Sequence, residues 1–327
     1  LDDGIDTIGK KMTVCQLYAK QIRHRGNVRY NTKNGRKRLM KLLEEDKLGG
    51  CPIDSVKLSD AKEWAIRMKE KGISYKTISN DKRSLKAAFY TAIQDDCIRK
   101  NPFDFQLNTV IEDDTEPKVP LTPAQEESFL SFAQNDKVYQ KYYDELIILL
   151  GTGLRISELC GLTDTDIDFE NRIINVDHQL LRSAETGYYI ETPKTKSGIR
   201  QIPMSEKVYE AFNRVLKRSR GAKAVTIDGY SNFLFLNRDG YPKTATNYDG
   251  MFRGHAKKYN KYHEEALPKV MTPHTLRHTF CTNMANAGMN PKALQYITGH
   301  SNITMTLNYY AHATFDSAKA EMLRIAA

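Results

Sequence analysis

An acidic stretch with little apolar periodicity follows Asn101-Pro102 and divides this chain of 327 residues into two segments. Its charged and turn-forming residues are Asp104, Glu112, Asp113, Asp114, Glu116 and Pro117. Such a stretch is typical of a linker, and a chain of this length is longer than one hydrophobic core usually extends. We therefore expect a first domain over residues 1–112, a linker over 113–120 and a second domain over 121–327.

The first domain has the apolar spacing of helices that are separated by short turns. We expect these helices at about Thr13–His24, Lys33–Lys47, from Ser59 onward and at about Tyr75–Ile93. Ser59 is the expected N-cap of the third helix, because a serine side chain accepts hydrogen bonds from the free amides of a first turn. Basic residues lie along the second and fourth predicted helices, on faces other than the apolar stripes. The first domain is therefore predicted to be a small helical bundle with basic edges.

The second domain is predicted to be rich in helices, with a small sheet embedded among them. Its first helix starts near Thr122-Pro123, where threonine can cap and proline fits the first turn. Three runs of β-forming residues come later, at Ile173–Val176, Tyr188–Ile190 and Ile199–Ile202, and Lys196-Ser197-Gly198 supplies a turn between the last two. The fold class is therefore mainly α with a small, three-stranded antiparallel sheet.

The positive charge of the chain is concentrated in its first domain. The formal net charge is +9, and residues 1–112 hold 23 Lys and Arg against 15 Asp and Glu. Such an excess favours a polyanionic partner, because each cation that neutralises a phosphate releases condensed counterions. No basic helix carries the broad apolar face that binding to a membrane surface requires. Nucleic acid is therefore the predicted partner.

The cysteines and the hydropathy predict a protein of the cytoplasm. The five cysteines are odd in number and widely spaced, with no CxxC pair and no secretory leader ahead of them. No apolar run approaches the length that spans a bilayer. The chain begins at Leu1 rather than at a methionine, which leaves open whether a further N-terminal domain precedes it.

The first candidate for a functional residue is Arg155, which follows a glycine turn after the apolar run Leu146–Leu150. At such a position a guanidinium group can present a planar fork of donors to a phosphate. The segment alone also fits a simpler interpretation, in which Gly151 and Gly153 end a helix and Arg155 forms a salt bridge with Glu158.

The second candidate segment is His274-Thr275-Leu276-Arg277-His278, at the start of a helix. His274 and Arg277 are three residues apart and share one helix face, near free amides that favour an anion. His274 and His278 have the spacing of a zinc pair, but no glutamate and no third ligand accompany them. A phosphate is therefore the favoured ligand, and no metal is expected. Alone, the segment fits a capping histidine and a surface arginine equally well.

The third candidate segment contains Gly299-His300, followed by Tyr309-Tyr310. Gly299 fits the C-cap of a helix, so that His300 enters the next turn and a tyrosine hydroxyl arrives one short helix later. Adjacent tyrosines on a helix are more often packing residues than catalytic ones. Each of the three segments is a weak signal when it is taken by itself.

Together the segments follow the order R…HxxR…GH…Y, in which this chain resembles the tyrosine recombinases. The resemblance covers the second domain, and the basic helical domain resembles the core-binding domain of that family. Runs such as Lys10–Lys20 and Leu307–Thr314 are most similar to integrases of Gram-positive conjugative transposons, which carry an additional N-terminal arm-binding domain. The resemblance implies a two-domain DNA clamp with a mixed α/β catalytic domain. It implies cleavage and rejoining of DNA strands through a phosphotyrosine, to excise and integrate a mobile element.

The resemblance also implies roles for four residues of the motif around the phosphate. Arg155 and Arg277 bind the non-bridging oxygens, whose charge grows in the transition state. A tyrosine hydroxyl is protonated at neutral pH, so its proton must be removed, and His274 is the expected base. His300 adds a hydrogen bond to the phosphate or to the leaving group.

Two implied roles have an alternative residue each. The family places a lysine in a β-hairpin turn, where it protonates the departing 5′-hydroxyl; Lys196 is the favoured residue and Lys194 the alternative. The nucleophile is Tyr309 by its spacing from the motif histidine. Tyr310 is the alternative, because it forms a Tyr-x-His ending with His312.

Double-stranded DNA is the implied substrate, and no cofactor is expected, because a phosphotyrosine conserves the energy of the broken bond. Phosphate contacts from the first domain are expected at Lys33, Arg36, Arg38, Lys76, Lys82, Arg83 and Lys86. An apolar stripe near the C-terminus predicts a helix that folds back on its own domain or, as the resemblance implies, docks on a neighbouring protomer of a tetramer. Its residues are Phe315, Ala318, Met322 and Ile325.

The resemblance further implies a bacterial, nucleoid-associated protein and an accessory excision factor. Two rival functions remain open on the sequence. One is a non-catalytic DNA-binding protein with the same fold, which a damaged site would indicate, but every expected position is filled. The other is a type IB topoisomerase, which uses similar residues and relaxes supercoils as a monomer.

Overall fold

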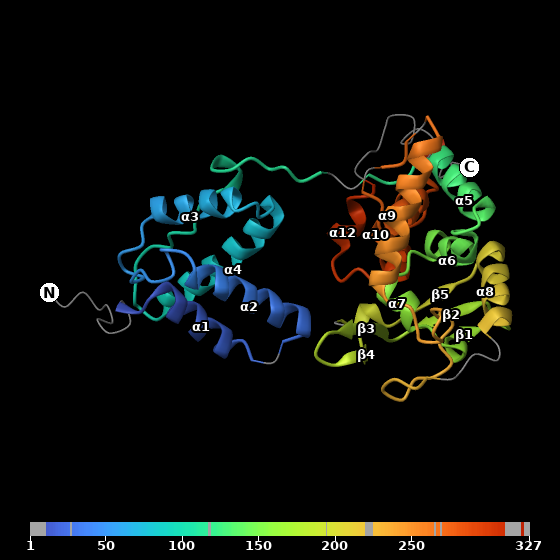
Figure 1. Ribbon diagram of the computed structural model, residues 1–327, viewed down its shortest axis with the longest axis horizontal. Coiled ribbons are helices and arrows are strands. Elements are labelled where there is room, and N and C mark those ends of the chain that lie inside the picture. The colour runs from blue at the N-terminus through green and yellow to red at the C-terminus, as the bar shows by residue number, and fades with distance from the viewer. Residues whose placement is uncertain are drawn as a thin grey trace. The chain divides into compact units, whose positions relative to one another are not determined.

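The computed structural model describes residues 11–26, 28–116, 119–193, 195–219, 225–264, 266–268, 270–310 and 322–323. The chain divides into two compact units, Leu1–Pro117 and Lys118–Ala327, which Figure 1 shows in its blue-to-green and green-to-red parts. Within the described ranges, no helix is long and apolar enough to cross a membrane.

The first unit is a bundle of helices, as its apolar spacing predicts. Its helices are α1 (Val14–His24), α2 (Tyr30–Glu44), α3 (Leu58–Glu70) and α4 (Tyr75–Gln94). Trp64, Phe89 and Phe103 form the aromatic centre of its core, and all three are fully buried. The Trp64 and Phe103 rings meet edge to face, with centroids 5.7 Å apart.

Two helix starts differ from the sequence prediction. The second helix begins at Tyr30 and ends at Glu44 rather than running from Lys33 to Lys47. Ser59 is not the N-cap of α3, because the carboxylate of Asp60 accepts the Lys57 amide at 2.8 Å and the helix starts two residues earlier than predicted. A carboxylate at the third helical position accepts the amide of the N-cap residue, as in one half of a capping box.

The second unit is a helical domain that holds two small antiparallel sheets. Its helices are α5 (Pro123–Asn135), α6 (Tyr143–Thr152), α7 (Ile156–Gly161), α8 (Glu206–Ser219), α9 (Ala245–Tyr262), α10 (Pro273–Asn286), α11 (Pro291–Thr298) and α12 (Ile303–Leu307). The apolar helix α6 packs against α8 on one side and α10 on the other (Figure 1). This packing brings the end of α6, where Arg155 follows, next to the start of α10, which carries Arg277.

The sheets correct the predicted strand pairing. Strands β1 (Ile167–Asp168), β2 (Ile173–Val176) and β5 (Arg200–Pro203) form one sheet, in that order, while β3 (Gln179–Ser183) and β4 (Gly187–Glu191) form a separate hairpin. The predicted run Tyr188–Ile190 therefore pairs with β3, which the sequence analysis overlooked, rather than joining the larger sheet.

The turn chemistry explains this pairing. The Ser183 hydroxyl accepts the Thr186 amide at 2.9 Å, and Gly187 takes a left-handed backbone with φ +71°, so β3 and β4 are joined by a tight local turn. The larger sheet aligns buried Ile174 with buried Ile202. Lys196-Ser197-Gly198 consequently forms a short 3₁₀ helix (η5) between the two sheets, not a hairpin turn between paired strands.

Candidate active site

Three arginines from separate elements converge on the C-terminal end of α11. Arg200 Nε donates to the Ile297 carbonyl at 2.6 Å, Arg277 Nη2 to the Thr298 carbonyl at 2.5 Å and Arg155 Nη2 to the Gly299 carbonyl at 3.0 Å. The last carbonyls of a helix have no partner within it and carry the negative end of its dipole. Three consecutive carbonyls are thus satisfied by three cations, which gathers the positive charge of the site at one point.

Gly299 makes this convergence sterically feasible. Its φ is +65°, and a Cβ at this position would lie 2.9 Å from the Ser197 carbonyl oxygen and 3.2 Å from Arg200 Cδ. Only glycine takes this backbone conformation readily and leaves room for the η5 turn to approach. The turn in the chain at Gly299 then directs His300 into the site.

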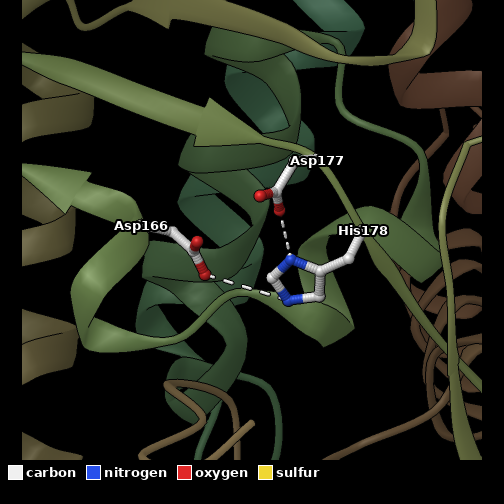
Figure 2. Close-up of side chains that lie close together, drawn as sticks. All are labelled: Asp166, Asp177 and His178. Carbon is white, nitrogen blue, oxygen red and sulfur yellow. Dashed lines mark hydrogen bonds and ion pairs between the residues drawn. The ribbon is translucent and has the colours of Figure 1, made fainter. Parts of the chain in front are cut away.

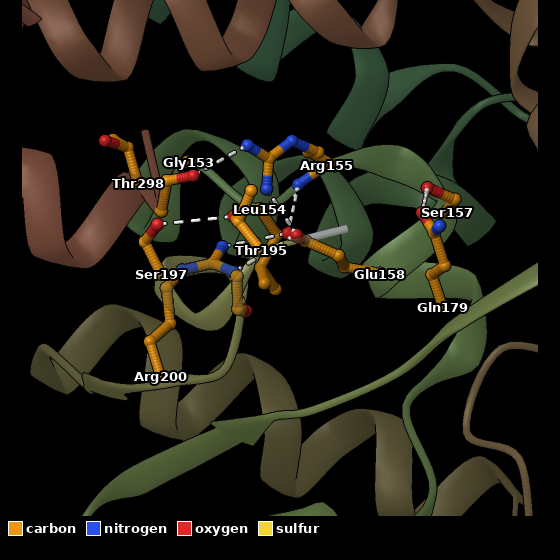
Figure 3. Close-up of polar contacts among 12 residues, drawn as sticks. Gly153, Leu154, Arg155, Ser157, Glu158, Gln179, Thr195, Ser197, Arg200 and Thr298 are labelled. Atoms are coloured by element: carbon orange, nitrogen blue, oxygen red, sulfur yellow. Dashed lines mark hydrogen bonds and ion pairs between the residues drawn. The ribbon is translucent and has the colours of Figure 1, made fainter. Parts of the chain in front are cut away.

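Glu158 lies between two of the arginines (Figure 3). Its carboxylate accepts from Arg155 Nη1 at 2.6 Å and from Arg200 at 3.1 and 2.8 Å, and it also accepts the Arg155 amide at 2.9 Å. Burial opposes its ionisation, but the hydrogen bonds and charges of Arg200 and Arg155 outweigh this and hold the pKa of Glu158 below its usual value. The salt bridge between Arg155 and Glu158, left open by the sequence, is present and belongs to the site.

Arg277 is almost completely buried, whereas Arg155 keeps about a third of its side chain exposed. Arg277 Nη1 also donates to the Gly153 carbonyl at 2.5 Å. Burial, followed by the neighbouring charge of Arg155, lowers the pKa of Arg277 to about 10, so the guanidinium remains protonated at neutral pH. The site therefore holds fixed positive charge of the kind that stabilises a phosphate.

Tyr309 packs against two histidine rings beside this cluster. Its ring centroid lies 4.9 Å from that of His278, edge to face, and 6.3 Å from that of His300, nearly parallel. Burial, then the Cys281 thiol and its hydrogen bond to the tyrosine, raise the pKa of Tyr309 to about 12, and the charge of Arg277 lowers it. The hydroxyl is therefore neutral in this state and needs a base before it can attack.

Tyr310 has a different environment from its neighbour. Its hydroxyl donates to the Met289 carbonyl at 2.5 Å, in the connection between α10 and α11. Its ring, like that of Tyr309, packs against the small cluster around Phe280 and Leu294, so the difference lies in the hydroxyl. Tyr310 thus anchors the end of α12, and its hydroxyl is committed to the backbone.

The other predicted residues of the site lie around these groups. His300 Nδ1 is 2.9 Å from the Thr306 hydroxyl, and burial followed by the charges of Arg277, Arg155 and Arg200 lowers its pKa to about 4, so it is neutral at pH 7. His274 is exposed in the first turn of α10, and Lys196 is exposed in η5. Lys194 and His312 lie outside the described residues.

The sequence analysis missed two residues of this site, Arg200 and His278. Arg200 was treated as part of an ordinary strand, although its two-residue spacing from Ile202 places both on the buried face of β5. An arginine on a buried face requires a carboxylate partner, and this signal was available. His278 was considered only as a metal ligand, whereas its ring contacts Tyr309.

The residues predicted to contact DNA phosphates differ in how far they are already engaged. Lys33 and Arg36 lie on α2, and Lys76 and Arg83 are exposed on α4. The other three are held by neighbours within the unit. Arg38 pairs with buried Asp81 at 2.5 Å, Lys86 pairs with Asp104 at 2.5 Å, and Lys82 lies 4.5 Å from the centre of the Phe105 ring.

A second polar cluster, formed by Asp166, Asp177 and His178, has the residue types of a metal site (Figure 2). Both ring nitrogens of His178 are engaged, however, Nδ1 with Asp177 at 2.6 Å and Nε2 with the Gly161 carbonyl at 2.8 Å. Asp166 in turn accepts the amide and the hydroxyl of Thr163, each at 2.7 Å. We interpret the cluster as a structural link between the end of α7 and the start of β3, in which His178 is buried and Asp177 is exposed.

Comparisons with known proteins match this chain to one family and to several relatives. Residues 120–317 match the model of the phage integrase family. The chain is 68% identical over 325 residues to the transposase from transposon Tn916 of Enterococcus faecalis, across 99% of this chain and 80% of that protein. It is also similar to solved structures of the Tn1549 transposon integrase, at 77% identity. With circular intermediate DNA the TM-score is 0.91 (96% of this chain, 99% of that chain), and with transposon right end DNA it is 0.90 (97% and 100%).

Proposed function

Because this chain belongs to the phage integrase family and is a tyrosine recombinase that acts on DNA in the site-specific recombination of a conjugative transposon, we propose that Tyr309 is its nucleophile. The observation that carries this proposal is the convergence of Arg155, Arg200 and Arg277 on the end of α11. The ring of Tyr309 packs against His300, the residue that directly follows this helix end. Fixed cations beside a tyrosine suit an in-line displacement at phosphorus.

The phosphate is held by Arg155 and Arg277. Arg155 is partly exposed and can reach a ligand with its planar fork, while Arg277 supplies a charge that burial makes stronger. His300, neutral at pH 7, accepts or donates one hydrogen bond at the same centre. His274 takes the proton of the tyrosine, and His278, in contact with the Tyr309 ring, orients that ring.

The bonds change as follows. The Tyr309 oxygen forms a bond to phosphorus while the bond from phosphorus to the 5′-oxygen breaks, and Lys196 gives that oxygen its proton. The product is a 3′-phosphotyrosine and a free 5′-hydroxyl. A 5′-hydroxyl from the partner strand reverses the same steps and reseals the DNA, so the cycle is isoenergetic in its covalent bonds and proceeds without metal or ATP.

Two observations support Tyr309 over Tyr310. The Tyr310 hydroxyl donates to the Met289 carbonyl, whereas the Tyr309 ring packs against the rings of His278 and His300. In the Tn1549 integrase, structures carry an arginine-to-lysine or a tyrosine-to-phenylalanine change at positions numbered 225 and 379, which are 154 residues apart. Tyr309 is 154 residues after Arg155 in this chain, and Tyr310 is 155 after it.

The domains divide the work on DNA. Residues 1–112 contact phosphates as a core-binding domain, 113–120 form the linker, and 121–327 form the catalytic domain with a C-terminal exchange helix. The division between the two compact units falls inside that linker, which supports these boundaries. The exchange helix joins a tetramer on DNA, and an accessory excision factor assists the reaction. The protein itself acts in the cytoplasm at the nucleoid. Of the four residues in the apolar stripe predicted for the exchange helix, Met322 lies within the described residues and is 70% exposed. Phe315, Ala318 and Ile325 lie outside the described residues.

Recombination between two attachment-site duplexes tests the proposal. Tyr309→Phe is expected to bind DNA and give no recombinant, while Tyr310→Phe retains strand cleavage. Cleavage by Tyr309→Phe would show that another residue is the nucleophile. Relaxation of supercoils without recombinant product would instead favour topoisomerase activity.

A further inference from the structure

We propose that Arg200 is a positioning residue that holds the turn of the general-acid lysine in register with the phosphate-binding arginines. The proposal rests on the proposed function, in which a lysine of this turn protonates the leaving 5′-oxygen. Arg200 starts β5, directly after the η5 turn that contains Lys196. The reaction does not require this arginine to touch DNA.

Arg200 connects three parts of the site through separate atoms. Its Nη1 and Nη2 reach the Glu158 carboxylate of α7 at 3.1 and 2.8 Å. Its Nε reaches the Ile297 carbonyl of α11 at 2.6 Å, and Nη1 also reaches the Gly198 carbonyl of the η5 turn at 3.0 Å. One guanidinium therefore fixes the turn to the same carboxylate that holds Arg155.

The burial of these charges indicates a role in geometry rather than in stability. The side chain of Arg200 is fully buried and that of Glu158 is 4% exposed. A buried ion pair often stabilises a fold no better than apolar residues of similar volume, because both ions lose their hydration. A planar fork with five donors does, however, fix three partners in one orientation, which no apolar side chain can do.

The η5 turn packs closely against two neighbouring segments. A Cβ at Gly198 would lie 2.3 Å from Pro193 Cβ, and a Cβ at Gly299 would lie 2.9 Å from the Ser197 carbonyl oxygen. The turn thus lies directly on the end of α11, and the Arg200 side chain bonds across this contact. Losing its hydrogen bonds releases the turn and with it the ammonium group of Lys196.

This placement predicts a defect confined to the leaving group. The lysine proton is needed as the bond from phosphorus to the 5′-oxygen breaks, because an alkoxide is a poor leaving group. A sulfur in place of that oxygen leaves as a thiolate and needs no proton. Substituting Arg200 should therefore slow cleavage of ordinary DNA and spare DNA with a 5′-bridging phosphorothiolate.

The test compares both substrates for Arg200→Met, Arg200→Lys and Arg172→Met, after thermal melting has shown which variants fold. Arg172 is the matched control, because it pairs with Glu206 at an exposed site in the same unit. We expect Arg200→Met to cleave ordinary DNA about 100-fold more slowly, with unchanged DNA affinity, and to cleave the sulfur substrate within a few fold of the unsubstituted protein. Arg200→Lys, which cannot reach all three partners, should show the same pattern to a smaller degree.

Equal defects on both substrates in any folded Arg200 variant would overturn the proposal, because they would show that the substitution impairs phosphate binding or the fold rather than leaving-group protonation. If Arg200→Met does not fold, Arg200→Lys decides the question by the same ratio. Lys196→Ala and Lys194→Ala, measured alongside, test the proposed acid separately. Rescue of the Lys194 variant alone would change the identity of the acid, and the ratio for the Arg200 variants would still decide whether Arg200 positions it.

Discussion

Arg277 donates a hydrogen bond of 2.5 Å to the carbonyl oxygen of Thr298, the last residue of α11. The flanking carbonyls of Ile297 and Gly299 are bonded in the same way by Arg200 and Arg155. The end of one helix therefore sets the positions of three cations.

Replacing Gly299 with alanine should damage the site directly. The new Cβ meets the Ser197 carbonyl and Arg200 in a backbone conformation that alanine adopts poorly, so cleavage should fall by about two orders of magnitude or more. Gly288→Ala is the matched control, because Gly288 also has a positive φ, +79°, but no atom lies within 4 Å of its Cβ. That control should lower stability by about 1 kcal/mol and leave cleavage intact. Similar cleavage by the two variants would contradict the packing described here.

Glu158→Gln should destabilise the catalytic unit. The substitution keeps the shape of the side chain but leaves the buried guanidinium of Arg200 without its counter-charge, a loss of about 3 kcal/mol. Glu206→Gln removes a carboxylate from an exposed pair with Arg172 and should leave the melting temperature unchanged. Thermal melting measures both. A Glu158→Gln protein as stable as the Glu206→Gln protein would show that the buried charge is not required.

His255 should make the catalytic unit less stable in mild acid. Its ring is buried among Phe129, Phe132 and Tyr139, and burial lowers its pKa from 6.5 to about 4. The unfolded chain therefore binds a proton between pH 6.5 and 4 that the folded chain does not bind. Stability falls as pH drops through this window, by at most about 3 kcal/mol from this residue.

Urea denaturation at pH 7 and pH 5 measures this effect. His255→Leu should reduce the loss of stability between the two pH values, whereas His24→Gln, at an exposed position, should leave it unchanged. His300, with a pKa of about 4, contributes in the same direction and remains in both variants. An unchanged pH dependence in His255→Leu would exclude His255 as a source of acid sensitivity.

Substitutions of basic residues in the first unit should fall into two groups: those that weaken DNA binding alone, and those that also destabilise the unit. Lys33→Ala and Arg36→Ala remove cations from α2 without breaking an ion pair described here, so each should weaken DNA binding and reduce the salt slope by about one contact. Arg38→Ala should lower the stability of the unit as well, because it leaves Asp81, 5% exposed, without its partner. Binding at several salt concentrations, together with melting, distinguishes the groups. An Arg38→Ala protein with unchanged stability would show that the Arg38–Asp81 pair does not stabilise the unit.

The sequence predicted the helical bundle and the motif residues because both depend on local patterns. Apolar spacing indicated the four helices of the first unit, and the tetrad of Arg155, Arg277, His300 and Tyr309 follows a fixed order along the chain. The strand pairing was wrong because pairing depends on which turns close, and the Ser183–Thr186 turn was not recognised. Arg200 was missed for a related reason. Its partners, Glu158 and Ile297, are distant in sequence, and only the fold brings them together.

The most direct test of this account is the position of the covalent bond to DNA. A nicked attachment-site duplex that loses its 5′-hydroxyl fragment after cleavage traps the phosphotyrosine, and mass spectrometry of the digested adduct locates the modified residue. The account predicts the adduct on Tyr309. An adduct on Tyr310, whose hydroxyl is bonded to the Met289 carbonyl in this structure, would contradict the assigned geometry of the site.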